Sequence, residues 1–126
     1  MSENCACSNS KPMILACSGA SNVGQLSNQA AVDLTQEGFG KIFCLAGIGG
    51  QLSGFVQSAK DVARLVVIDG CPVGCARAIL EKNGIENKNY VVITDLGIEK
   101  NKDLTPDPQA LDTVKTEVKQ GLKTTV

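Results

Sequence analysis

Four short apolar runs, each followed by a segment with helical periodicity, constrain the fold of this chain more than any other feature. Strand-forming runs that alternate with helices indicate a parallel sheet whose strands are joined by right-handed crossovers. We therefore expect an α/β fold of three layers: about four strands, mostly parallel, with helices on both faces of the sheet. Asn22, with Gln25 three residues on, is the predicted N-cap of the first helix. The predicted strands are residues 12–17, 41–45, 64–69 and 90–94.

The composition agrees with a sheet that is buried on both faces. The chain has 126 residues, of which 43% are hydrophobic but only 3% are aromatic, and none is tryptophan. Its core must be built from Val, Ile, Leu and Ala, as is typical of a parallel sheet covered by helices. The length fits one domain. We therefore divide the chain into a flexible, cysteine-bearing tail (1–11) and a single α/β domain (12–126).

Charge and hydropathy argue against several classes of partner. The formal net charge is −1, which gives no electrostatic reason to expect nucleic acid or an acidic membrane surface. No apolar run approaches the roughly 20 residues that a membrane span requires, and the polar N-terminus lacks the apolar stretch of a signal peptide. We therefore expect a cytoplasmic protein. In that reducing compartment, cysteines more often bind metals or carry redox chemistry than form disulfides.

Cysteines recur at the carboxyl ends of the first three predicted strands. Cys17 closes the first strand, Cys44 lies near the end of the second, and Cys71 follows the third. The carboxyl ends of parallel strands emerge at one edge of the sheet, where ligands bind. Strands lie about 4.8 Å apart, and sulfurs that share a zinc ion at about 2.3 Å lie roughly 3.8 Å from each other. Three thiols can therefore converge on one ion, best if the strand order is 2-1-3-4.

Cys75 supplies a fourth thiol. Pro72 suits a first helical position, so we expect Cys71 to be the N-cap of the next helix, with Cys75 one turn further along the same face. Both sulfurs would then lie at the positive end of this helix, which favours thiolates. The chain has no histidine, so the leading hypothesis is a metal-binding domain in which four thiolates hold one Zn²⁺ per chain. The alternative is that some of these cysteines are only core residues.

Several other residues are candidates for supporting roles. Asp69 ends the third strand and could orient the thiolate-bearing loop, although capping the following turn is the alternative. Ser18 belongs to a polar loop after the first strand, and Gly70 leaves room for a close backbone approach. Cys5 and Cys7 lie in the tail, where they could form an accessory metal-binding arm, a redox pair or neither.

Three segments of the chain resemble the DGC-domain family. They are residues 69–75 (DGCPVGC), residues 17–24 (CSGASNVG) and residues 44–49 (CLAGIG), and the resemblance spans roughly residues 12–120. The family is proposed to chelate zinc with four cysteines. The resemblance implies that these are Cys17, Cys44, Cys71 and Cys75, and it implies no settled biochemical activity.

The sequence leaves three functions open. The first is a small metal-binding protein used in metal handling, sensing or structure, with zinc as its partner. The second is a thiol-based oxidoreductase or transferase with Cys71 or Cys17 as nucleophile, although no histidine is available as a general base. The third is an iron–sulfur protein on the same four thiolates, but the usual clustered cysteine spacing is missing. Whether the protein is an enzyme, and which protein or small molecule it meets, stays undecided.

Overall fold

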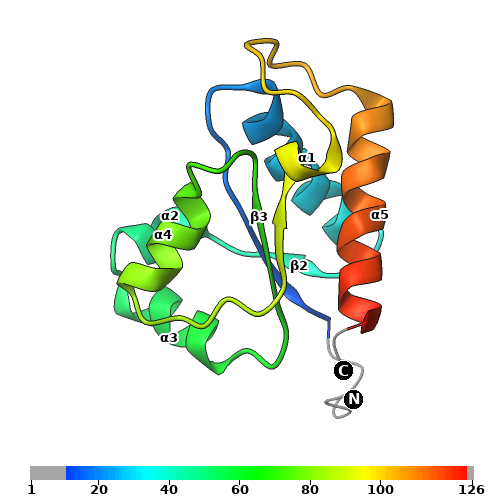
Figure 1. The fold of residues 1–126 in the computed structure, drawn as a ribbon. Coiled ribbons are helices and arrows are strands. Elements are labelled where there is room, and N and C mark those ends of the chain that lie inside the picture. The colour runs from blue at the N-terminus through cyan, green and yellow to red at the C-terminus, as the bar shows by residue number, and fades with distance from the viewer. Residues whose placement is uncertain (1–10, 125–126) are drawn as a thin grey trace.

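The computed structural model describes residues 11–124 and contains one four-stranded sheet in which all strands are parallel (Figure 1). The strand order is β2-β1-β3-β4, as the cysteine argument predicted, and the α/β class is confirmed. β1 and β3 are the central strands of this sheet and are almost wholly buried, whereas β2 is exposed and β4 is half-buried at the edges. The strands are β1 (Met13–Ala16), β2 (Lys41–Ile42), β3 (Leu65–Asp69) and β4 (Tyr90–Val92).

Helices cover both faces of this sheet. Figure 1 shows α1 and α5 on one face and the shorter helices α2, α3 and α4 on the other, so the predicted three layers are present. The last helix starts at Pro108, and the carboxylate of Asp107 accepts a hydrogen bond from the backbone N–H of Ala110, as expected of an N-cap. The elements are α1 (Asn22–Gln36), α2 (Leu45–Gly49), α3 (Ser53–Asp61), α4 (Cys75–Lys82), the 3₁₀ helix η3 (Ile93–Leu96) and α5 (Pro108–Thr124).

Side chains that alternate along the central strands build two separate cores. Ile14, Val66 and Ile68 pack with α1 and α5. Leu15 and Val67 point to the opposite face and pack with α2, α3 and α4. Both sets are almost wholly buried, so the two central strands are rigidly placed and their carboxyl ends are fixed in space.

All four strands are shorter than predicted, and the second and fourth end early because the chain turns toward a helix. The second strand stops at Ile42, and Cys44 becomes the N-cap of the unpredicted helix α2. The fourth strand stops at Val92, where the chain turns into η3. In both places apolar residues continue past the strand, so the pattern of hydrophobic residues does not mark the boundary.

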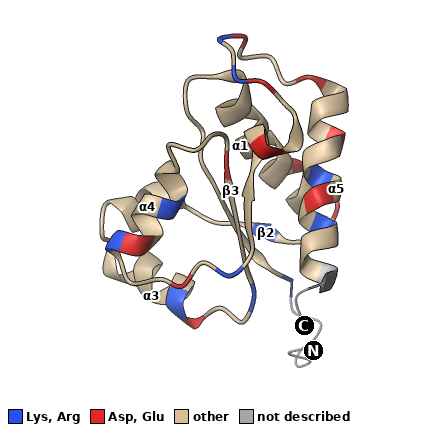
Figure 2. Ribbon diagram, in the orientation of Figure 1, with Lys and Arg blue, Asp and Glu red and all other residues tan. Residues whose placement is uncertain are grey.

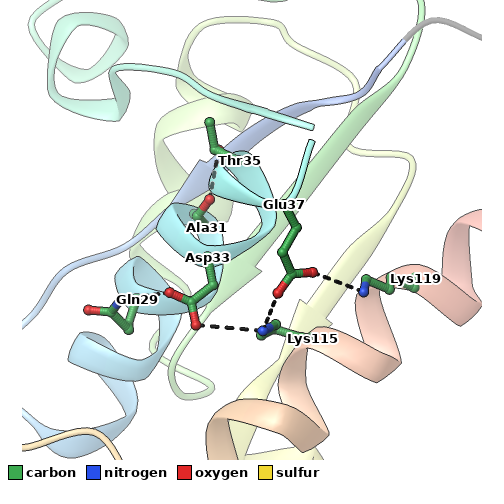
Figure 3. Close-up of polar contacts among 7 residues, drawn as sticks. All are labelled: Gln29, Ala31, Asp33, Thr35, Glu37, Lys115 and Lys119. Atoms are coloured by element: carbon green, nitrogen blue, oxygen red, sulfur yellow. Dashed lines mark hydrogen bonds and ion pairs between the residues drawn. The ribbon is translucent and has the colours of Figure 1, made fainter. Parts of the chain in front are cut away.

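A cluster of charges joins α1 to α5 (Figure 3). Lys115 of α5 contacts Asp33 of α1 at 3.6 Å and also contacts Glu37, the C-cap of α1, whose carboxylate lies 3.1 Å from the ammonium of Lys119. The hydrogen bond from Lys115 lowers the pKa of Glu37, and the same bond raises the pKa of Lys115. Figure 2 shows basic and acidic residues alternating along the middle of α5.

None of the helices within residues 11–124 combines the length and apolar character needed to cross a membrane.

Candidate functional site

A cavity of about 440 Å³ opens at the carboxyl edge of the sheet. Its walls come from the loop after β1, the first turn of α1 and the turn after β3. Cys17, Cys71 and Cys75 all line it, although they belong to different parts of the chain. The register of the sheet explains this meeting, because Ala16 of β1 pairs with Ile68 of β3, so the two strands end at the same level.

Cys17 continues the ladder of hydrogen bonds beyond β1. Its backbone N–H donates to the carbonyl of Ile68 at 3.1 Å, and its Sγ accepts the N–H of Gly70 at 3.3 Å. The side chain is half-buried. The thiol is therefore held against the turn that carries Cys71.

Glycines permit this tight junction. A Cβ on Gly70 would lie 2.8 Å from the carbonyl carbon of Val23, and one on Gly24 would lie 2.6 Å from the carbonyl oxygen of Gly19. Real side chains do not come so close to backbone atoms. The start of α1 thus packs directly on the backbone of both neighbouring loops, and the walls of the cavity are fixed by backbone contacts.

The helix after β3 does not begin where the sequence predicted. α4 starts at Cys75, and its N-cap is Gly74 in the left-handed conformation (φ 69°). Cys71 is not the N-cap; its carbonyl accepts the N–H of Gly74 at 3.1 Å and closes a separate turn. The expectation from Pro72 was wrong because Gly74, two residues later and in the left-handed conformation, is the N-cap, so that the helix begins only after it. Cys75, the first helical residue, is exposed, whereas Cys71 is half-buried.

Asp69 occupies the N-terminus of α4. Its Oδ1 accepts the N–H of Ala76 at 2.8 Å, and its Oδ2 accepts the N–H of Arg77 at 3.0 Å and the hydroxyl of Tyr90 at 2.6 Å. The carboxylate is almost wholly buried, at 1% exposure. The N–H groups at the start of this helix were expected to stabilise the cysteine thiolates, but those of Ala76 and Arg77 donate to the carboxylate of Asp69 instead. Burial, followed by the hydrogen bond to Asp69, raises the pKa of Tyr90.

The remaining predicted residues lie around the rim. Cys44 is exposed and does not line the cavity, but the next residue, Leu45, does. The Sγ of Cys44 caps α2 by accepting the N–H of Gly47 at 3.3 Å. Ser18 lines the cavity, and its carbonyl accepts the side-chain amide of Gln25 at 3.3 Å. Cys5 and Cys7 lie outside the described residues.

Lys100 is a component of the cavity that the sequence did not suggest. It lines the wall, and its Nζ lies 3.4 Å from the Sγ of Cys71. The loop that carries Lys100 is hydrogen-bonded to Asn22, the first residue of α1.

Asn22 was predicted to be the N-cap of α1, and this prediction was wrong. The N-cap is Ser21, whose hydroxyl accepts the N–H of Gly24 at 3.1 Å. Nothing in the sequence signals that a charged segment 78 residues after Asn22 returns to the site.

The thiols are brought to one edge but do not form a closed metal centre. Within residues 11–124, no three cysteine, aspartate or glutamate side chains stand close enough together to hold one metal ion as they are. Three of the sulfurs receive separate donors: the N–H of Gly70, the N–H of Gly47 and the ammonium of Lys100. Thiolates are the ligands that zinc prefers in four-coordinate sites. The donor set therefore suits a soft metal, provided that side chains rotate toward one another.

Comparison with known proteins gives the family. The DGC domain model matches residues 13–118, a range that contains the four candidate cysteines. The chain is similar to the "Anaerobic and virulence modulator AnvM" of Pseudomonas aeruginosa, with 32% identity over 89 residues, which cover 71% of this chain and 68% of that protein. No solved structure matches the chain significantly. This protein is a member of the DGC domain family.

Proposed function

We propose that this protein binds one zinc ion through the thiolates of Cys17, Cys44, Cys71 and Cys75 and serves in metal handling, sensing or structure in the cytoplasm. The observation that supports this most is the lining of one cavity by three of these thiols, which come from two strand ends and a helix start. Core cysteines would be spread through the interior; these lie at the edge where α/β sheets bind ligands.

The surroundings of the sulfurs suit thiolates that share a metal. A dication on four thiolates carries a net charge of about −2, and donors to the sulfurs offset it. The N–H groups of Gly70 and Gly47 and the ammonium of Lys100 are such donors. When bound, zinc would offset part of the negative charge of the thiolates and hold the loops after β1 and β3 together.

Closing the site requires the side chains of Cys17, Cys71 and Cys75 to rotate and Cys44 to move toward the cavity. Cys75 is exposed at the first position of α4, so its side chain can rotate without disturbing the core. Cys44 must also approach, and it is the only one of the four outside the cavity wall. Structural zinc binding is worth about 10–16 kcal/mol in small peptides, whereas a strained side-chain rotation costs about 0.5–1.5 kcal/mol. The metal can therefore drive the rearrangement.

Metal content tests the proposal. The full chain, purified under reducing conditions without added metal, should contain roughly one zinc ion, as a four-thiolate site would. Cys75→Ser should lose this zinc, while the double variant Cys5→Ser with Cys7→Ser is the matched control and should keep it. Because Cys44 lies outside the cavity wall, Cys44→Ser should weaken binding least among the four. Wild-type protein without zinc, or Cys75→Ser with full zinc content, would refute the proposal.

A thiol enzyme with Cys71 as nucleophile is the second candidate. The contact of Lys100 with Cys71 and a cavity much larger than a metal ion favour it. In metal-free protein this function requires Cys71 to react with an alkylating agent faster than the more exposed Cys75. Slower labelling of Cys71 than of Cys75 would count against it.

A further inference from the structure

The charged side chains that line the cavity are Asp69 and Lys100. The two oxygens of Asp69 already accept three hydrogen bonds, from Ala76, Arg77 and Tyr90. Lys100 makes one contact with the Sγ of Cys71, and an ammonium has three N–H donors. The ammonium of Lys100 therefore gives the cavity a positive charge and N–H donors that a bound molecule can use, next to the thiol of Cys71.

The position of Lys100 is enforced by its neighbours in the chain. The side-chain amide of Asn22 donates to the carbonyl of Glu99 at 2.7 Å, and its oxygen accepts the N–H of Asn101 at 2.6 Å. The backbone N–H of Asn22 adds a third bond, to the carbonyl of Asn101 at 3.0 Å. Asn22 is 9% exposed. Both residues that flank Lys100 are thus hydrogen-bonded to the first residue of α1, so the backbone that carries Lys100 is held beside the cavity.

From this arrangement we propose that the cavity binds a small carboxylate-bearing molecule beside Cys71, with Lys100 as the anion-binding residue and Asn22 as its positioning residue. One ammonium matches the single charge of a carboxylate. The volume of about 440 Å³ lies within the roughly 300–1,000 Å³ of small-molecule sites. The apolar and small residues of the wall, such as Ala20 and Val73, suit the uncharged part of the molecule. This goes beyond zinc binding, and it concerns the cavity of the metal-free chain, in which the thiol of Cys71 is not a metal ligand.

Paired alkylating agents test the proposal on the metal-free, reduced full chain. Iodoacetate carries a carboxylate and iodoacetamide is its neutral counterpart. With both reagents the Sγ of Cys71 attacks the methylene carbon, an S–C bond forms, the C–I bond breaks and iodide leaves. Both reagents meet the same population of thiolate, so comparing the ratio of their rates between variants isolates the charge of the reagent. Mass spectrometry of peptides gives the rate at each cysteine.

Lys100→Gln should lower the iodoacetate-to-iodoacetamide rate ratio at Cys71 about fivefold, the effect of two unit charges roughly 4 Å apart in water. Lys100→Arg should keep most of the ratio. Lys102→Gln removes a lysine of the same loop that does not line the cavity, and it should leave the ratio unchanged. Asn22→Ala should lower the ratio because Lys100 loses its anchor. Lys100 is exposed, so its variants test the proposal even if Asn22→Ala fails to fold.

Unreactive analogues give the second readout. Propionate should slow the reaction of Cys71 with iodoacetamide in the wild type but not in Lys100→Gln, and propionamide should slow it in neither. Equal rate ratios in the wild type and Lys100→Gln, equal protection by propionamide, or stronger protection by inorganic phosphate would overturn the proposal. Zinc content is measured separately, so the two proposals can fail independently. A chain that binds zinc but shows no preference for carboxylates would refute only the carboxylate site, and a chain that prefers carboxylates but binds no zinc would refute only the zinc site.

Discussion

Tyr90→Phe tests whether Asp69 organises the edge of the sheet. The hydroxyl of Tyr90 donates to Oδ2 of Asp69 at 2.6 Å. Arg77 lies over the aromatic ring, with its guanidinium carbon 5.8 Å from the ring centre. Phenylalanine keeps the ring and this cation–π contact, so the substitution removes one hydrogen bond and little else. The two backbone N–H donors from α4 remain on Asp69.

The structure sets the magnitude of this loss. A hydrogen bond to a charged group contributes about 1.5–3 kcal/mol. Tyr90 is only half-buried, and water can reach the carboxylate oxygen once the hydroxyl is gone. We therefore expect the free energy of unfolding to fall by about 1–2 kcal/mol at pH 7, toward the lower end of that range.

The pH dependence provides a sharper signature. The pKa of Tyr90 is raised in the folded state by burial and by the negative charge of Asp69, so the folded chain keeps its proton longer than the unfolded chain. The contribution of Tyr90 is therefore fully present below the unfolded pKa of about 10 and is lost as the pH rises above it. There the wild type should lose up to about 1.4 kcal/mol per pH unit more than Tyr90→Phe.

Urea unfolding at pH 7 and at several values between about 9 and 11, spanning the ordinary tyrosine pKa, measures both effects under reducing conditions. The difference in the free energy of unfolding between the two proteins should stay constant up to about pH 10 and narrow above it. Equal stability at pH 7, or two stability curves that stay parallel above pH 10, would mean that the Tyr90–Asp69 bond contributes nothing and that α4 is held by other contacts.

Three further predictions follow from particular contacts. Asp69→Ala leaves two N–H groups of α4 without their acceptor and should cost about 3–5 kcal/mol in urea unfolding; a loss below that of Tyr90→Phe would contradict the capping role. Gly70→Ala should destabilise by about 1–3 kcal/mol because the added Cβ meets backbone atoms of α1. Gly121→Ala, in α5 with no atom within 4 Å of the new Cβ, is its control and should stabilise by about 0.5–1 kcal/mol. Glu37→Gln should lower the free energy of unfolding by less than about 1 kcal/mol. Because the pKa of Glu37 is lowered on folding, this difference in stability should vanish as the pH falls below about 4, and it should shrink in 1 M NaCl. A difference that persists at low pH and in high salt would refute the ion-pair explanation.

The sheet could be predicted from the sequence because its signal is repeated. Each strand is an apolar run and each helix has its own periodicity, so the class and the three layers follow from the pattern alone. The pattern does not determine the strand order; β2-β1-β3-β4 was suggested only as the order that best lets Cys17 approach the cysteines of both neighbours, and the structure has it. Strand ends were less predictable, because Cys44 follows apolar residues whether β2 continues or α2 begins.

The details of the site depend on contacts between distant segments, which local patterns do not record. Pro72 led to the wrong prediction that Cys71 is the N-cap, because the left-handed Gly74 is the N-cap and α4 begins at Cys75. Asn22 reads as a helix cap, yet its side chain bonds to residues 99 and 101. No local sequence signal predicts that Lys100 reaches Cys71, since the loop that carries it has no regular structure.

The use of Asp69 changes the electrostatic argument for the thiols. A helix N-terminus can support one nearby negative charge with its first N–H groups, and at α4 the groups of Ala76 and Arg77 are bonded to a buried carboxylate. The charge that offsets a thiolate must therefore come from elsewhere. If the proposed zinc site forms, the donors next to Cys17 and Cys71 are the N–H of Gly70 and the ammonium of Lys100. Cys75, which is exposed at the start of α4, has neither of these donors, so under the proposal its charge would be offset mainly by the metal. That is why its substitution is the most direct test of zinc binding.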